Sequence, residues 1–502
     1  MAERSSPFSA LDALLLLTFL NLSLQPLVDP DFGWHLRTGL DFLSSRQWPR
    51  LDPYSHTLPD WPWVEHAWLA DALIGFVYAT LGSAGALGVI LLFAAVITTA
   101  FMLGAAPART DRTMRLAAMV TAAWVALPFL GARMQMITLL GLAVVIWLVR
   151  RYLGGERAQL WIILPVFLLW GNLHGGFTAG LFALGLMLAA AMLTRIAAAF
   201  WSALRDQVDE PVASWSRIRH LALMMVMAAL ITLVNPYGWR LHAEIYSSLT
   251  DRFMVDTLYE WQPVSLHRRA GVVYASYLVM LGSAVLLFYR RIEPVRWGIW
   301  VVFLGLSLRH WRNVPVFLLV SLPLSAEMIG EAAGRAGRLF SLSRQQLKRL
   351  LLTTTFIVAL SLVWLDSDHL ENIAVAGLAP QEFFRGTEYP IEALQWIQQH
   401  RDELGARLYN DYGFGGFLLW WLPGEKIFID GRMPAWRVGS RWILYDYIAL
   451  TNRDPPELGV LDKYQVQWAM SARETALDQV LRNDRGWRLV YEDAKVAIHA
   501  RR

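Results

Sequence analysis

Long apolar runs dominate the first two thirds of the chain and alternate with short polar segments. Most of these runs approach the length of about 20 residues that a helix needs to cross a bilayer. The pattern predicts eleven membrane-spanning helices, near residues 9–28, 84–106, 116–131, 134–150, 159–173, 177–197, 219–234, 271–289, 296–310, 313–329 and 350–366. The first run lacks a small-residue cleavage site, so we expect an uncleaved first span.

One further apolar segment, residues 67–81, is short and is interrupted by Asp71 and Gly75. If this segment does not cross the membrane, the loops alternate cleanly between the two faces, and one set of loops carries a group of basic residues that the positive-inside rule assigns to the cytoplasm. These residues are Arg4, Arg109, Arg112, Arg115, Arg150, Arg151, Arg157, Arg195, Arg205, Arg217, Arg219, Arg290, Arg291, Arg296, Arg335, Arg338, Arg344, Lys348 and Arg349. We therefore predict an interfacial helix on the outer surface, a cytoplasmic N-terminus and an outer C-terminus.

Composition supports a polytopic α-helical membrane protein. Hydrophobic residues make up 56% of the 502 residues and charged residues only 17%, which excludes a disordered, fibrous or ordinary cytosolic protein. The basic residues are scattered over many loops, so they give no nucleic-acid-binding surface. Cysteine is absent, which excludes disulfides and thiolate chemistry.

The last part of the chain changes character. Charged residues return after Asp366, and short helical and strand patterns alternate. We expect helices at 388–404, 416–421 and 472–481, strands at 407–409 and 426–429, and a hairpin of 487–491 with 495–499. The sequence therefore predicts a transmembrane domain over 1–366, which includes the first outer loop 29–66 and the interfacial helix 67–81, and a small extracytoplasmic α/β domain over 367–502.

Acidic residues collect in the first outer loop, where residues 28–66 hold six acidic and three basic side chains. Asp29 and Asp31 follow the first span, and a carboxylate at the mouth of a span can serve as general base toward an acceptor hydroxyl. The alternative is that these two carboxylates cap the loop or pair with Arg37. Glu65 with His66 is the next candidate pair, although both could simply be polar residues before the interfacial helix.

Cationic residues occupy the later outer turns, at Arg133, His174, Arg309 and Arg312. Arginine and histidine suit a phosphate leaving group, because arginine presents a planar fork of donors. The structural alternatives are a satisfied imidazole in a tight turn for His174 and snorkelling anchors for the last two arginines.

Further candidates are aromatic or lie in the C-terminal domain. Trp63 could present a face to a sugar ring or belong to the aromatic belt of the membrane. The glycine-rich turn 410–416 matches no phosphate-binding spacing and is a weak signal. Asp430 and Arg432 stand at a strand end, where α/β folds place ligand contacts, and a structural Asp–Arg pair is an equal alternative. No cofactor is assigned; Asp29 and Asp31 with an outer histidine would suit a divalent metal, but their spacing is not diagnostic.

This architecture resembles the GT-C superfamily of polytopic glycosyltransferases, which use polyprenyl-phosphate sugars: a short N-terminal span, an outer loop with acidic residues near its start, an interfacial helix, a bundle of spans and an outer C-terminal domain. Its members include protein O-mannosyltransferases, the aminoarabinose transferase of lipid A and oligosaccharyltransferases. Within this superfamily, six sequence segments resemble a largely uncharacterised family of bacterial membrane proteins. The six segments are DPDFGWHLRTG, WVEHAWLA, NLHGGF, NPYGW, RHWRNVPVF and YNDYGFGGFLLWWLPGEKIFIDGR. The resemblance covers nearly the whole chain. It places the superfamily's first-loop acidic motif on Asp29 and Asp31, and a second acidic position on Glu65. Many members carry an adjacent Asp-Glu pair, whereas Pro30 separates the two aspartates here.

The resemblance implies an inverting glycosyltransferase on the outer face of the bacterial cytoplasmic membrane. Its partners would be a polyprenyl-phosphate-linked sugar donor, a lipid, glycan or protein acceptor, and membrane lipid, with no nucleic acid. We expect three groups of site residues: Asp31, Asp29 and Glu65 in catalysis; Arg133, His174, Arg309 and Arg312 at the donor phosphate; and His35, His66, Trp63, Asp430 and Arg432 at the substrate. The alternatives are a transporter or flippase of lipid-linked glycans and a non-catalytic assembly scaffold. No internal inverted repeat, which a transporter would favour, is visible.

Overall fold

The computed structural model describes residues 8–200, 212–288, 294–339, 346 and 368–502. The described residues fall into two compact units, which we describe separately. Unit 1 takes its residues from Met1–Gln25, Leu91–Gly238 and Asp256–Leu370. Unit 2 takes its residues from Pro26–Ile90, Trp239–Val255 and Glu371–Arg502. The first outer loop and the 67–81 segment are thus grouped with the C-terminal part of the chain and not with most of the apolar helices.

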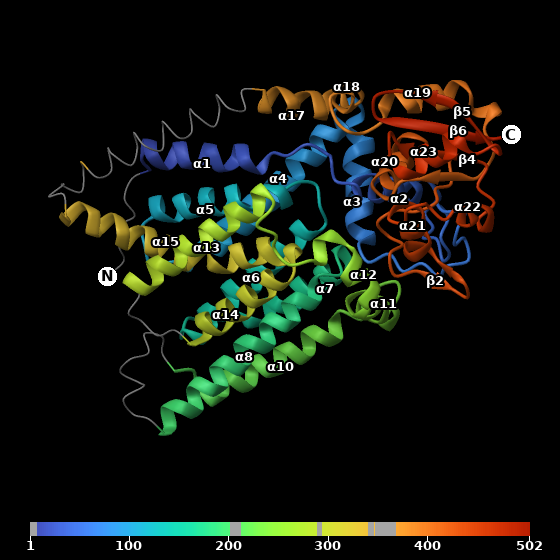
Figure 1. Cartoon of the computed structure of the whole chain (residues 1–502). Coiled ribbons are helices and arrows are strands. Elements are labelled where there is room, and N and C mark those ends of the chain that lie inside the picture. Colours follow the sequence, from blue (N-terminus) through green and yellow to red (C-terminus); the bar gives the residue numbers. More distant parts are fainter. Residues whose placement is uncertain (1–7, 201–211, 289–293, 340–345, 347–367) are drawn as a thin grey trace. The chain divides into compact units, whose positions relative to one another are not determined.

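Unit 1 is a bundle of apolar helices. They are α1 (Ala10–Ser23), the later part of α4 (Gly85–Ala105), α5 (Arg112–Ala126), α6 (Gln135–Leu153), α7 (Ile163–Leu173), α8 (Phe177–Phe200), α10 (Trp215–Ile231), α13 (Arg269–Phe288), α14 (Pro294–Arg309) and α15 (Val314–Leu339). Short 3-10 helices η2 (Leu127–Phe129), η3 (Leu160–Ile162), η4 (Tyr259–Trp261) and η5 (Trp311–Asn313) join or flank them. Figure 1 shows α8 and α10 running side by side, and α5 packs against both α1 and α15.

Every predicted span that falls on described residues contains a helix, and the predicted span 350–366 lies outside them. In the part of the chain that the structure describes, five helical segments are long and apolar enough to cross a bilayer: Trp68–Ala105, Gln135–Leu153, Phe177–Phe200, Arg269–Leu287 and Trp311–Ala336. The helices Ala10–Ser23 and Leu160–Leu173 are apolar but shorter. The chain is therefore a multi-pass membrane protein, while the count of eleven spans and their orientation stay predictions.

Two buried tyrosine hydroxyls inside the bundle are paired, as expected because an unpaired polar group is costly in apolar surroundings. The Tyr274 hydroxyl lies 2.6 Å from Ser307 Oγ, and the Tyr277 hydroxyl lies 2.7 Å from Ser325 Oγ. These bonds tie α13 to α14 and α15. The bundle thus satisfies these polar groups internally.

Unit 2 combines helices from the first outer loop with a small sheet. Its helices are α2 (Phe32–Ser45), α3 (Trp68–Leu81), η1 (Gly82–Ala84), α11 (Trp239–Thr250), α18 (Pro380–Arg385), α19 (Ile391–Gln399), η6 (Arg401–Glu403), η7 (Tyr412–Phe414), α20 (Gly415–Trp421), α21 (Ile443–Thr451), α22 (Gly459–Lys463) and α23 (Ala476–Asn483). Two further helices, α12 (Arg252–Thr257) and α17 (His369–Leu378), stand at the unit boundaries in the sequence. Helix α3 leads through η1 into α4, so the predicted interfacial segment is the first part of a continuous 38-residue helical stretch.

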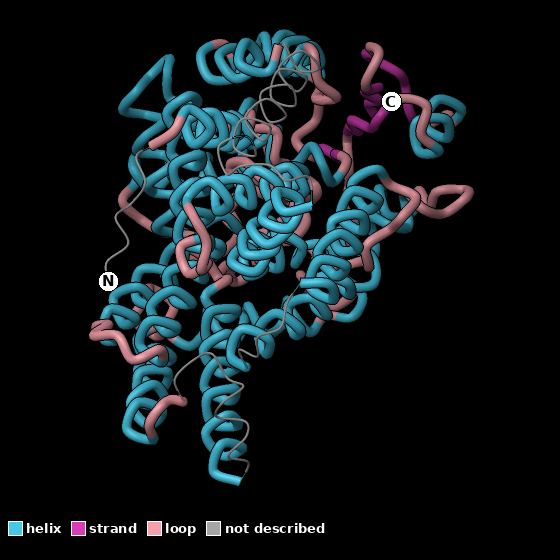
Figure 2. Tube along the Cα trace, turned by 90° about the vertical axis from the view of Figure 1, so that its left-hand side faces the viewer, coloured by secondary structure: helices cyan, strands magenta, loops and turns pink. Residues whose placement is uncertain are grey.

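The main sheet has four strands in the order β1-β4-β6-β5. They are β1 (Leu408–Asn410), β4 (Trp468–Ala472), β5 (Trp487–Glu492) and β6 (Val496–Arg501), and a two-stranded ribbon pairs β2 (Arg437–Val438) with β3 (Arg441–Trp442). Strand β1 is parallel to β4, and the other pairs are antiparallel. Figure 2 shows these strands gathered near the C-terminus. The predicted hairpin and the strand near 407–409 are confirmed.

Two local predictions in unit 2 are wrong. Residues 426–429 form no strand of the sheet. Ile427 makes a single β-bridge with Ser55, and the side chains of Asn410 and Thr57 form hydrogen bonds with the backbone of Phe428. Phe428 N–H donates to Asn410 Oδ1, and Thr57 Oγ1 donates to Phe428 O. The helix expected at 472–481 begins at Ala476, because the Thr475 side chain accepts a hydrogen bond from the Asp478 backbone N–H and caps it there.

Candidate functional site

The first outer loop and the C-terminal part of unit 2 meet where helices α2 and α20 cross. The crossing is close because both helices carry glycine there: a Cβ atom on Gly33 would lie 1.9 Å from Gly416 O, and one on Gly416 would lie 2.1 Å from Pro30 O. The glycine-rich turn of the sequence therefore has a packing role. It brings the Asp-Pro-Asp segment of the first loop against the start of α20.

Asp31, the predicted catalytic base, stands at the N-terminus of α2 and is half-buried. Its Oδ1 accepts a hydrogen bond of 3.1 Å from Trp34 Nε1–H. Asp29 Oδ1 in turn accepts the Asp31 backbone N–H at 3.0 Å, so the two predicted carboxylates belong to one turn. The Asp31 carboxylate also abuts Gly431, where a Cβ atom would lie 1.8 Å from Oδ1.

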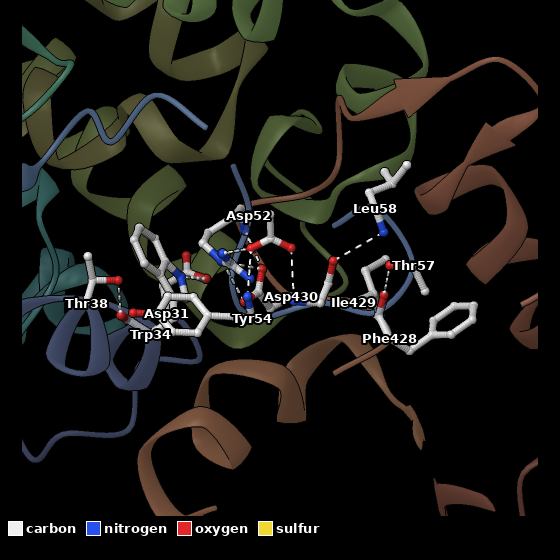
Figure 3. A network of polar contacts seen from close by, with 12 residues as sticks. Asp31, Trp34, Thr38, Asp52, Tyr54, Thr57, Leu58, Phe428, Ile429 and Asp430 are labelled. Atoms are coloured by element: carbon white, nitrogen blue, oxygen red, sulfur yellow. Dashed lines mark hydrogen bonds and ion pairs between the residues drawn. The ribbon is translucent and has the colours of Figure 1, made fainter. Parts of the chain in front are cut away.

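Gly431 separates Asp430 from Arg432, and this pair lies in a buried ion-pair network. Arg432 Nε donates to Asp430 Oδ2 at 2.8 Å, and Arg432 Nη1 donates to Asp52 Oδ1 at 2.7 Å. Burial alone would lower the pKa of Arg432, but the charges of the two carboxylates outweigh it and raise the pKa. Figure 3 shows Asp52 and Asp430 between Asp31 on one side and Phe428 on the other. The structural pair that the sequence left open is therefore present.

Aromatic rings surround the Arg432 guanidinium. Its central carbon lies 5.1 Å from the ring centroids of Tyr54 and Trp63, 5.5 Å from that of Trp436 and 6.0 Å from that of Trp34. These distances are in the range of cation–π attraction. Trp63 is only 5% exposed and packs beside the Arg432 guanidinium. Its predicted role at the substrate stays a prediction.

His35 and Glu65 belong to a second group of buried side chains, which contacts Trp34 through His35. The His35 ring stacks on the Trp34 ring with centroids 3.4 Å apart, and His35 Nδ1 lies 2.6 Å from Asp71 Oδ1. Burial lowers the pKa of His35 to about 3. His66 is a neighbour, with its ring centroid 6.4 Å from that of His35. Of this group, His66 is the most exposed, and its Nδ1 lies 3.9 Å from Glu65 Oε1.

Glu65 is fully enclosed, with 1% of its surface exposed. Burial raises its pKa well above the usual value, and the nearby charge of Asp71 adds to the rise. The Ala67 backbone N–H donates to Glu65 Oε1 at 2.9 Å. A raised pKa favours the protonated carboxyl, which can donate a hydrogen bond. Unit 2 thus brings together Asp29, Asp31, His35, Trp63, Glu65, His66, Asp430 and Arg432 through the contacts of Trp34 and Arg432.

The predicted phosphate contacts all belong to unit 1, where two of them gather around η4. Arg133 Nη1 lies 3.9 Å from Glu260 Oε1, and the Arg312 guanidinium carbon lies 4.2 Å from the Trp261 ring centroid. His310 Nδ1–H donates to the Trp261 carbonyl at 2.6 Å, which fixes η4 beside the residues that precede α15. Three segments distant in the sequence therefore meet here. Arg309, the last residue of α14, is exposed.

His174 caps α7 and is held in one tautomer. The Gly176 backbone N–H can only donate, and its acceptor at 3.1 Å is His174 Nδ1. The Thr138 hydroxyl lies 2.7 Å from the same nitrogen, so it also donates, and the neutral ring carries its proton on Nε2. A Cβ atom on residue 176 would lie 1.9 Å from Thr138 Oγ1, which explains the glycine. The tight turn that the sequence left open as the structural alternative for His174 is present, and His174 lies near the first turn of α6, as Arg133 does.

Sequence reasoning assigned no role to Asp52, Asp71, Tyr54 or Trp436. Asp71 gave the clearest signal, since a charged residue inside an apolar helix is expensive and is usually paired or functional. No sequence signal marked Asp52, Tyr54 or Trp436. Their importance comes from contact with Arg432, which for Asp52 lies 380 positions away in the chain.

Comparison with known proteins agrees with the fold. No protein-family model and no curated protein matches the chain. The structure is similar to ArnT from Cupriavidus metallidurans bound to undecaprenyl phosphate, with a TM-score of 0.52 and 15% identity, over 98% of this chain and 97% of that chain. It is also similar to the Archaeoglobus fulgidus oligosaccharyltransferase tethered with an acceptor peptide, with a TM-score of 0.53 and 12% identity, over 92% of this chain and 68% of that chain.

A second structure of the archaeal enzyme, AglB in complex with an inhibitory peptide and a dolichol-phosphate, gives a TM-score of 0.52 at 10% identity, over 92% of this chain and 69% of that chain. ArnT and AglB are GT-C glycosyltransferases that use polyprenyl-phosphate sugar donors. The expected resemblance to the GT-C superfamily is therefore confirmed for the fold. The narrower likeness to a bacterial membrane-protein family stays a prediction.

Proposed function

We propose that the protein is a glycosyltransferase that moves a sugar from a polyprenyl-phosphate donor to a lipid, glycan or protein hydroxyl on the outer face of the cytoplasmic membrane. The observation that carries the proposal is the similarity in fold, over nearly all of both chains, to a protein bound to undecaprenyl phosphate. The half-buried carboxylate of Asp31 at the start of α2 supports it.

Asp31 acts as the general base in this proposal. The acceptor oxygen attacks the anomeric carbon while the bond from that carbon to the phosphate oxygen breaks. The polyprenyl phosphate leaves with the bonding electrons, and the hydroxyl proton passes to the Asp31 carboxylate. Attack opposite to the leaving group inverts the anomeric configuration. The hydrogen bond from Trp34 orients Oδ1 of the base.

Other residues bind and orient the substrates. Glu65, which accepts the Ala67 backbone N–H, is an orienting acidic group, and Asp29 fixes the turn that carries Asp31. The remaining residues of this unit, His35, His66, Trp63, Asp430 and Arg432, shape the substrate side. Arg133, His174, Arg309 and Arg312 contact the donor phosphate, and His174 can do so through its Nε2 proton.

The test is transfer of labelled sugar from a polyprenyl phosphate in membranes that contain the full-length chain. Asp31→Asn keeps an oxygen acceptor for Trp34 but removes the base, so we expect a loss of about 10²-fold or more. Asp60→Asn is the matched control, because Asp60 is an exposed carboxylate of the same loop, paired with Arg441, and should leave transfer unchanged. Equal transfer by Asp31→Asn and wild type would refute the assignment of the base. Lack of transfer by the wild type, with labelled donor moved across the membrane, would favour the flippase alternative.

A further inference from the structure

Three buried side chains that commonly bind metals converge in unit 2 beside Trp34. His35 on α2, Glu65 before α3 and Asp71 on α3 each offer one ligand atom, and these atoms lie within 4.8 Å of one another. The three residues are 5%, 1% and 0% exposed. The cluster therefore has the ligand types and the enclosure of a metal site.

The two carboxylates of this cluster lack sufficient partners. Among the described residues, no group donates a hydrogen bond to Glu65 Oε2 or to Asp71 Oδ2, and both atoms are buried. The nearby Arg432 is already paired with Asp52 and Asp430 at 2.7 and 2.8 Å. A buried carboxylate without a counter-charge is costly, so the cluster needs a cation or a proton.

The backbone holds two of these side chains in fixed positions. Gly39 and Gly75 follow His35 and Asp71 by one helical turn, and here α2 and α3 come into backbone contact. A Cβ atom on Gly39 would lie 1.9 Å from Asp71 O, and one on Gly75 would lie 2.7 Å from the Gly39 carbonyl carbon. Stacking on Trp34 fixes the His35 ring as well. Such preorganisation is typical of a built ligand set.

We propose that His35, Glu65 and Asp71 bind one divalent metal ion of the Zn²⁺ type. One imidazole nitrogen and two carboxylate oxygens suit this ion, and three protein ligands leave a fourth position for water or substrate. Ligand atoms around tetrahedral Zn²⁺ lie about 3.4 Å apart, so the cluster contracts modestly on binding. The proton shared by His35 and Asp71 leaves, because both must ligate in their deprotonated forms. The inference does not need the transferase proposal, since metal binding is measured without sugar substrates.

The experiment titrates Zn²⁺ into the full-length protein, stripped of metal and held in detergent or nanodiscs, against a competing chelator. We expect one tight equivalent per chain for the wild type, and at least a tenfold weaker affinity for His35→Gln, Glu65→Gln and Asp71→Asn. His56→Gln is the matched control, because His56 lies in the same loop and its Nε2–H donates to Leu408 O, outside the cluster. It should bind as the wild type does.

Thermal unfolding with and without Zn²⁺ gives a second readout that a merely destabilising substitution would not mimic. Zn²⁺ should raise the melting temperature of the wild type and of His56→Gln, and it should not raise that of the three cluster variants. If the wild type binds no tight equivalent, or if the isosteric Glu65→Gln and Asp71→Asn variants bind Zn²⁺ as tightly as the wild type, the cluster is a protonated carboxyl pair and the proposal is overturned. Either result leaves the role of Asp31 in sugar transfer to its own test.

Discussion

Arg432 Nη1 donates to Asp52 Oδ1 at 2.7 Å, although 380 positions separate the two residues in the chain. The pair is buried within unit 2 and is completed by Asp430. It fastens the first outer loop to the segment that follows α20. The loop that carries Asp31 is thus held by a charge network and not only by the helices that flank it.

Removal of Arg432 should therefore destabilise unit 2. Arg432→Gln leaves two buried carboxylates without their cation, and breaking a buried pair on one side costs about 3–5 kcal/mol. Arg437→Gln is the control, because Arg437 has a side chain 55% exposed and lies 3.4 Å from Asp251, so its loss should cost no more than about 1 kcal/mol. Thermal unfolding of the purified full-length chain would measure both. Equal melting temperatures for the two variants would contradict the structural role of the network.

The position of Asp31 can be tested without altering Asp31 itself. Gly431→Ala places a Cβ atom 1.8 Å from Asp31 Oδ1, so the short carboxylate must turn away and lose its bond from Trp34. Sugar transfer should fall about tenfold or more, because catalysis depends on hydrogen-bond reach, while the fold should change little. Gly424→Ala is the control, since its Cβ atom would meet open space. Full transfer by Gly431→Ala would argue against Asp31 as the base.

The sequence predicted most of the helical fold because the dominant signal is local. Apolar runs of near-membrane length become helices wherever the structure describes them, and the hairpin of β5 and β6 follows from a short turn between two strand patterns. Strand β4 was not predicted. It is short and buried on both faces, so its residues show no alternation of apolar and polar positions.

The candidate site was predictable only as separate pieces. The first-loop carboxylates were conspicuous, as were the cations of the outer turns, because charged groups are unusual beside membrane spans. Two contacts join residues that are far apart in the chain: Asp52 with Arg432, and Gly33 with Gly416. No local spacing pattern in the sequence predicts them. His35 and Asp71 likewise come together only because α2 and α3 pack glycine to glycine.

Acidification should weaken unit 2 through His56. Burial lowers the pKa of His56 to about 4, whereas an unfolded histidine titrates near about 6.5. Between about pH 6.5 and about pH 4, His56 is protonated in the unfolded state but stays neutral in the folded state. The free energy of unfolding therefore drops by up to about 1.4 kcal/mol for each unit by which the pH falls. His56→Gln keeps a donor for Leu408 O and removes this loss. Melting temperatures of the two proteins should agree near pH 7.5 and diverge toward pH 4, and parallel curves would contradict the assignment.

Substitution of Arg312 should weaken donor binding more than it slows the chemical step. Its guanidinium lies over Trp261, and we propose that it binds the donor phosphate, so Arg312→Gln should raise the KM for the polyprenyl-phosphate sugar about tenfold with a smaller change in kcat. Arg268→Gln is the control, because Arg268 lies over Tyr259 of the same η4 helix at 4.0 Å but is not among the proposed phosphate contacts. Steady-state kinetics with varied donor would distinguish them. The same rise in KM for both variants would assign the effect to η4 packing.

The membrane topology is the remaining requirement, since the first outer loop and the C-terminal residues must face one compartment. The chain contains no cysteine, so single cysteines report their side without background. Ser44 in the first loop and Ser440 between β2 and β3 are both exposed and can be changed to cysteine, as can the exposed Ala106 between α4 and α5, beside the basic residues predicted to be cytoplasmic. A membrane-impermeant maleimide applied to intact spheroplasts should label the first two and should reach Ala106→Cys only after permeabilisation. Because a carboxylate on one face cannot take a proton from an acceptor on the other, labelling of Ser44→Cys and Ser440→Cys on opposite faces would rule out sugar transfer in the form proposed.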